Sequence, residues 1–124
     1  MLKKTVALLL MVGVSQANFS EVTDSNFEKE VLQSDRPVVL KAYVPGCSAC
    51  LVISPIFNIL SNEYDPRYKF VEINVRSNAG VRSRYNLKMV PVVLFFKDGK
   101  EVGRKGGMMT KSVFARLIEQ YLRY

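Results

Sequence analysis

The sequence contains no histidine and no tryptophan, and its only cysteines are Cys47 and Cys50. The absence of histidine excludes Ser-His-Asp hydrolysis, Cys-His proteolysis and every histidine-ligated metal or haem site. A length of 124 residues leaves room for one domain, which excludes a two-domain enzyme. Any chemistry must therefore use other groups, and the cysteine pair is the first candidate.

The composition also lacks extremes. It is 48% hydrophobic, 23% charged and 10% aromatic, which is typical of a globular protein and excludes disordered, collagen-like and membrane-bundle classes. The formal net charge is +7, but the basic side chains are scattered apart from a loose cluster of Arg76, Arg82, Arg84 and Lys88. No recognisable nucleic-acid module surrounds this cluster, so we interpret it as a solvated face and expect no nucleic-acid partner.

The first 17 residues have the pattern of a secretory signal peptide that is cleaved before Asn18. Lys3 and Lys4 precede an apolar run from Thr5 to Val14, and Ser15-Gln16-Ala17 supplies small residues at the cleavage site. A membrane anchor is the alternative, but the run is far shorter than the roughly 20 apolar residues that span a bilayer. We therefore predict one domain over residues 18–124, secretion into a bacterial periplasm and no stable membrane insertion.

Hydrophobic periodicity predicts alternating helices and strands in residues 18–124. The capping-box pattern Ser25-x-x-Glu28 begins a short helix over about 26–33. Strands are predicted over 37–44, 69–75, 90–96 and 101–105, and helices over 47–64, 77–85 and after Thr110. Asp98-Gly99 is a hairpin signal between the last two strands. This order predicts an α/β fold with a mixed central sheet of about four to five strands, covered by helices on both faces.

Cys47-Ser48-Ala49-Cys50 lies where the first of these strands gives way to a helix. Unpaired backbone N–H groups and the positive end of the helix dipole stabilise a thiolate at such a place. A disulfide that closes so short a loop constrains the unfolded chain little. The pattern therefore favours a redox-active dithiol over a structural disulfide, two unpaired thiols or half of a metal site.

With these features in place, the sequence resembles the thioredoxin family from about Phe19 to Leu122. Pro55 matches the proline that kinks the family's active-site helix, and Val90-Pro91 matches its cis-proline. Lys97-Asp98-Gly99 matches its hairpin, and Gly107 matches its glycine before the last helix. The resemblance implies a thioredoxin fold and a cofactor-free thiol–disulfide oxidoreductase. The family's usual loop is Trp-Cys-Gly-Pro-Cys, and both the tryptophan and the loop proline are missing here.

The resemblance also implies roles for individual residues. Cys47 would form a mixed disulfide with a protein substrate, and Cys50 would then resolve it. Val90 and a cis Pro91 would offer extended backbone to the substrate and exclude metals, whereas an ordinary strand-edge proline is the alternative. Candidates for an apolar rim, or for core packing instead, are Tyr43, Val44 and Met108.

Lys41 interrupts the apolar strand over 37–44. Many thioredoxins bury an aspartate at this position and place its lysine partner on the neighbouring strand, where this chain has Glu72. We hypothesise a charge-swapped pair in which Glu72 accepts a proton near Cys50 and Lys41 favours the thiolate. The alternative is that Lys41 extends its alkyl stem to reach water.

The sequence lacks the helical insertion that is typical of dedicated disulfide-introducing oxidases, which favours a reductase. We expect a monomer whose partners are protein disulfide or dithiol substrates and a redox partner, such as a membrane thiol transporter. Two alternatives remain from other classes. One is a non-catalytic thioredoxin-fold binding module with a static disulfide, and the other is a thiolate metal carrier.

Overall fold

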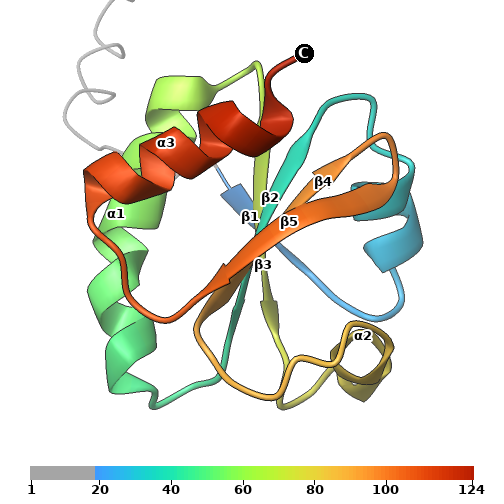
Figure 1. The fold of residues 1–124 in the computed structure, drawn as a ribbon. Coiled ribbons are helices and arrows are strands. Elements are labelled where there is room, and N and C mark those ends of the chain that lie inside the picture. Colours follow the sequence, from blue (N-terminus) through green and yellow to red (C-terminus); the bar gives the residue numbers. More distant parts are fainter. Residues whose placement is uncertain (1–18) are drawn as a thin grey trace, which may run out of the picture.

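The computed structural model describes residues 19–124, and the predicted signal peptide over residues 1–17 lies outside the described residues. Within the described range the chain forms a five-stranded sheet with helices on both sides (Figure 1). The elements in chain order are β1 (Phe19–Val22), η2 (Glu28–Leu32), β2 (Val38–Tyr43), α1 (Ser48–Tyr64), β3 (Lys69–Asn74), α2 (Ala79–Arg84), β4 (Val92–Lys97), β5 (Lys100–Gly106) and α3 (Lys111–Leu122).

The strand order across the sheet is β1-β3-β2-β4-β5. β3 pairs in parallel with both β1 and β2, because the crossovers between these strands return the chain to the same end of the sheet. β4 is antiparallel to both β2 and β5. The mixed sheet predicted from the order of helices and strands is therefore confirmed.

Two hydrophobic layers sandwich the sheet because successive strand side chains point to opposite faces. In β2, Val38, Leu40 and Ala42 belong to one core and Val39 belongs to the other. The first core is closed by apolar residues of η2 and α2, and the second by those of α1 and α3. Figure 1 shows α1 and α3 together on one side of the sheet and α2 on the other. The predicted coverage of both faces is confirmed.

The hairpin between β4 and β5 has the predicted turn residues. Asp98 and Gly99 both have positive φ, at 54° and 78°, as a two-residue hairpin turn with the twist of its strands requires. A Cβ at Gly99 would also lie 2.9 Å from the carbonyl oxygen of Leu32. Both the backbone conformation and the space therefore require glycine at this position.

The start of the domain differs from the prediction in two ways. β1 was not predicted, because only Val22 of its four residues is buried and the strand is defined by its pairing with β3. The α-helix predicted over 26–33 is a shorter π-helical turn, η2, in which the N–H of Gln33 donates to the carbonyl of Glu28. The capping box does not form, since η2 has no side-chain cap. The wide turn instead directs Phe27 and Val31 into the core.

The boundaries of β4 differ from the prediction at the site end of the strand. The predicted strand began at residue 90, whereas β4 begins at Val92. Pro91 has no N–H to donate to a strand ladder, so regular pairing starts one residue later. The carbonyl of Pro91 still accepts a 2.8 Å hydrogen bond from the N–H of Gly107.

Candidate active site

The dithiol sequence lies at the start of α1, directly after β2. Gly46, at φ +82°, allows the turn between the two elements. Cys47 has extended backbone angles and caps the helix, and its Sγ accepts a 3.1 Å hydrogen bond from the N–H of Cys50. Cys47 Sγ therefore lies at the N-terminus of a 17-residue helix, where free N–H groups and the helix dipole favour a thiolate.

Cys47 and Cys50 form a disulfide with their Cα atoms 5.2 Å apart. The two cysteines differ in exposure. Cys50 is buried, with only 4% of its surface exposed, whereas Cys47 is partly exposed. A disulfide partner arriving from solvent can therefore reach the sulfur of Cys47 more easily than that of Cys50. This asymmetry is what an attacking and a resolving thiol require.

The register of the sheet brings Val90 and Pro91 to the same end as the dithiol. Ala42, near the end of β2, pairs with Val92 at the start of β4, and Val92 pairs with Gly106 at the end of β5. The Val90–Pro91 peptide bond is cis, as the resemblance implied. The segments that lead into Cys47 and out of Pro91 are thus neighbours in the sheet, although they are far apart in the sequence.

Lys41 and Glu72 are partners across β2 and β3, and their charges meet. Lys41 Nζ lies 3.1 Å from Glu72 Oε1, and the two side chains are only 3% and 20% exposed. The alternative in which Lys41 reaches water is therefore wrong. The structure instead contains the opposite-charge pair that we hypothesised from the sequence.

Ser54 connects this pair to the active-site helix, and sequence reasoning missed it. Lys41 Nζ donates to Ser54 Oγ at 3.0 Å, and Ser54 Oγ donates to the carbonyl of Cys50 at 2.9 Å. Lys41 Nζ also lies 4.9 Å from the ring centroid of Phe57, a cation–π distance. The position of Ser54, four residues after Cys50 on one helix, was a signal for its bond to the Cys50 carbonyl but not for its contact with Lys41.

A pocket of about 220 Å³ opens between the ion pair and the disulfide. Its wall includes Lys41 and Glu72 on the sheet and Cys47, Cys50 and Ser54 at the start of α1. The same small space therefore borders the carboxylate of Glu72 and both cysteines.

Tyr43 also lines the pocket. It was predicted to contribute to an apolar rim or to the core, but its hydroxyl makes a polar contact. Its hydroxyl donates a 2.6 Å hydrogen bond to Glu21 Oε2 on β1. Burial raises the pKa of Tyr43 above its usual value, and the hydrogen bond to Glu21 and the charge of Glu72 raise it further. Tyr43 therefore stays protonated at neutral pH and remains a hydrogen-bond donor. No local pattern indicated the contact with Glu21, which joins residues 22 positions apart.

Several apolar side chains at sequence positions close to the site residues are exposed. Val44 lines the pocket, and Met108, which is 56% exposed, follows the glycine that bonds to Pro91. Other large exposed apolar side chains next to site residues are Leu51, Val52 and Met89. This end of the domain therefore offers apolar contacts to a polypeptide.

Two kinds of site are absent from residues 19–124. No group of three or more histidine, cysteine, aspartate or glutamate side chains in this range is placed to hold a metal ion. No helix in the same range combines the length and the apolar character that a membrane span needs.

Comparison with known proteins agrees with the family resemblance seen in the sequence. The thioredoxin family profile matches residues 18–120. Thioredoxin C-2 of Corynebacterium nephridii is 35% identical over 104 residues, which cover 84% of this chain and 96% of that protein. Thioredoxin 1 of Nostoc sp. is 32% identical over 103 residues, which cover 83% and 96%. Thioredoxin of Rickettsia bellii is 34% identical over 93 residues, which cover 75% and 89%.

Proposed function

Since the chain belongs to the thioredoxin family and is a thiol–disulfide oxidoreductase, we propose that it reduces protein disulfides through Cys47-Ser48-Ala49-Cys50. The observation that carries the proposal is the arrangement of the two sulfurs. Cys47 is partly exposed at the N-terminus of α1, and Cys50 is buried one turn further along the helix.

The reaction takes two exchange steps. In the first, the Cys47 thiolate attacks one sulfur of the substrate disulfide, so that this S–S bond breaks, a mixed disulfide forms and the first substrate thiolate leaves. In the second, the Cys50 thiolate attacks Cys47 Sγ and releases the second substrate thiolate. Two electrons pass from the protein to the substrate, and the two leaving thiolates take up the protons. The protein finishes with the Cys47–Cys50 disulfide.

The charged pair has a role in the second step. Cys50 must lose its proton before it attacks, and Glu72 is the carboxylate that shares a pocket with it. Lys41 holds this carboxylate in place and favours the thiolate by its positive charge. Val90 and Pro91 would hold the extended substrate chain against the Cys47 sulfur.

The connections between the strands favour a reductase over a dedicated oxidase. β3 and β4 are joined through the six-residue α2, so among the described residues this crossover carries no helical domain of the kind that dedicated oxidases contain. The signal-peptide pattern over residues 1–17 is the basis on which we propose a bacterial periplasm as the location. A periplasmic reductase needs electrons from a membrane partner, and we propose that a membrane thiol transporter delivers them to a monomeric domain.

The test is the reduction potential of the Cys47–Cys50 pair, measured by equilibrating residues 18–124 with defined thiol buffers and trapping the free thiols. A value near about −270 mV supports a reductase, and a value near about −120 mV identifies a disulfide donor. Insulin reduction by the wild type and by Cys47→Ser is the matched activity assay. A pair that does not equilibrate, with no turnover, would assign the disulfide to structure and the domain to a non-catalytic binding module.

A further inference from the structure

A basic segment lies directly beside the dithiol. The chain leaves β3 next to the end of β2, where the N–H of Val75 donates to the carbonyl of Tyr43 at 2.9 Å. The next residue, Arg76, donates from Nη2 to the carbonyl of Pro45 at 3.4 Å. The segment then passes through α2 and ends at Lys88, two residues before Val90. Both of its ends therefore adjoin the site.

The segment carries positive charge and no negative charge. Residues 73–97 contain no aspartate or glutamate, and Arg76, Arg82, Arg84 and Lys88 are all exposed. Within the described part of the chain, none of the four forms an ion pair, although other basic residues such as Lys41 do. Their charges are therefore available to a partner.

Two carboxylates packed against this segment, those of Asp24 and Glu101, are occupied by other donors. Asp24 accepts from the N–H groups of Gly80 and Val81, at 2.9 and 2.8 Å. Glu101 pairs with Arg104, which also donates to the carbonyl of Tyr85. Arg84 lies 5.4 Å from the ring centroid of Tyr85 and lines a pocket together with Asp24 and Glu28. Since Arg84 shares a pocket with carboxylates, we consider only the charges of Arg76, Arg82 and Lys88 as a docking surface.

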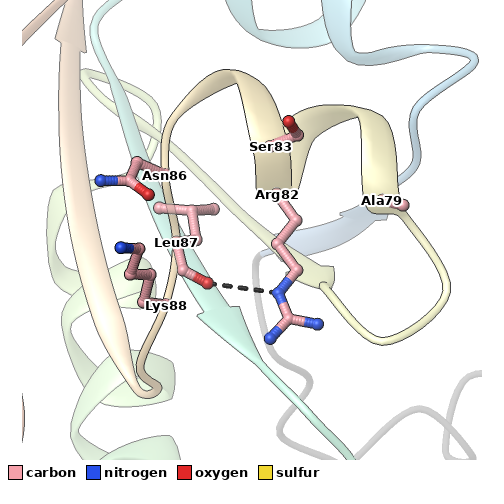
Figure 2. A pocket seen from close by; sticks show the side chains of 6 residues that line it. All are labelled: Ala79, Arg82, Ser83, Asn86, Leu87 and Lys88. Carbon is pink, nitrogen blue, oxygen red and sulfur yellow. Dashed lines mark hydrogen bonds between the residues drawn. The ribbon is translucent and has the colours of Figure 1, made fainter.

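The surface is also concave. A pocket of about 500 Å³ is lined by Ala79, Arg82, Ser83, Asn86, Leu87 and Lys88, and Figure 2 shows these side chains. Arg82 Nε donates to the carbonyl of Leu87 at 3.4 Å, which fixes the guanidinium at the pocket and leaves its two terminal nitrogens for another acceptor (Figure 2). Asn86, at φ 56°, turns the chain between α2 and Lys88.

We propose that Arg76, Arg82 and Lys88 form a docking surface for an acidic segment of the substrate protein, the one whose disulfide reacts with Cys47. Carboxylates next to the reacting disulfide would bind the guanidinium and ammonium groups while the extended chain lies along Val90 and Pro91. The surface selects among disulfide substrates by charge and speeds their encounter with the thiolate. This inference rests on the reductase function proposed above.

The experiment compares two model substrates with the same disulfide, one flanked by aspartate and glutamate residues and one by serine and glycine residues. At low salt, we expect kcat/KM of the reduced wild-type protein to be about tenfold higher for the acidic substrate. The preference should shrink as sodium chloride is added, because salt screens exposed charges. Arg82→Glu with Lys88→Glu should abolish or reverse the preference, while the rate on the neutral substrate stays unchanged.

Two further variants control for net charge and folding. Lys100→Glu with Arg116→Glu makes the same change in net charge on the β4–β5 hairpin and on α3, away from the segment, and should keep the preference. Arg82→Gln with Lys88→Gln removes the charges without adding repulsion and should reduce the preference to about twofold or less. The proposal would be overturned if Arg82→Glu with Lys88→Glu (the docking-surface variant) and Lys100→Glu with Arg116→Glu lost the preference for the acidic substrate equally. It would also be overturned if Arg82→Gln with Lys88→Gln kept the full preference.

A binding measurement separates this proposal from the reductase function. A fluorescent, cysteine-free acidic peptide is titrated with the oxidised wild-type protein and with the same variants. If the wild type reduces both substrates equally and the peptide binds no better to it than to the docking-surface variant, the docking proposal fails and the reductase stands. If the wild type reduces neither substrate, the reductase function fails. The docking surface is then still supported if the peptide binds more weakly to Arg82→Glu with Lys88→Glu but not to the control variant Lys100→Glu with Arg116→Glu. Tighter binding of single-stranded DNA than of peptide would assign the surface to nucleic acid and overturn the proposal.

Discussion

Lys41→Met is the sharpest test of the buried ion pair. The substitution keeps most of the side-chain volume and removes an ammonium that is only 3% exposed. Glu72 then loses its 3.1 Å partner, and Ser54 loses the donor at 3.0 Å. Removing one member of a buried pair costs about 3–5 kcal/mol, and because Glu72 is 20% exposed beside a pocket, we expect the lower end, about 3 kcal/mol.

The assay is urea unfolding of the oxidised wild type, of Lys41→Met and of Lys41→Met with Glu72→Gln. The double variant removes the orphaned charge, so it should recover at least half of the lost free energy of unfolding. In the reduced protein, the pKa of the cysteine thiols should rise in Lys41→Met, since a positive charge next to the site is gone. Single and double variants that both match the wild type in stability and in thiol titration would refute the role given to the pair.

Two other predictions concern β5 and β3. Gly103→Ala should lower the free energy of unfolding by about 1–3 kcal/mol in thermal or urea unfolding, because its Cβ would overlap the ring of Tyr121. Gly106→Ala, which meets no atom within 4 Å, is the control and should cost less than half as much. The hydrogen bond and charge of Lys69 hold the pKa of Glu30 below its usual value. This contact therefore stabilises the fold at pH values above the unfolded-state pKa of Glu30. The stabilisation is lost as the pH falls through the folded-state pKa. Glu30→Gln should flatten this part of the stability profile between neutral and acidic pH, and an unchanged profile would contradict the assignment.

Long periodic segments of the fold could be predicted from the sequence because their pattern follows from burial. β2 is buried on both faces and reads as a nearly continuous apolar run, and α1 has the spacing of a helix with one buried side. β1 could not be predicted, since its backbone is extended only because β3 lies beside it. The same holds for η2, where the packing of Phe27 and Val31 decides the width of the turn.

The candidate site divides in a similar way. The position of Cys47 and Cys50 at a helix start follows from local sequence, and the Lys41 and Glu72 pair was hypothesised only because the resemblance aligned the two strands. Ser54 was missed because a serine inside a helix usually bonds to its own backbone or to water. Its contact with Lys41 depends on how α1 packs against β2, which no local pattern encodes.

The two edges of the sheet are protected against pairing with other chains. β1 is an edge strand of only four residues, and β5, on the other edge, carries Lys100, Arg104 and Lys105. A short edge and a lysine-rich edge both disfavour the addition of a foreign strand, which is the first step of edge-to-edge aggregation. For a protein proposed to act on extended polypeptides, this matters at high substrate concentration. A substrate chain released from Val90 after exchange therefore meets a short edge and a positively charged edge, both of which disfavour its pairing with the sheet.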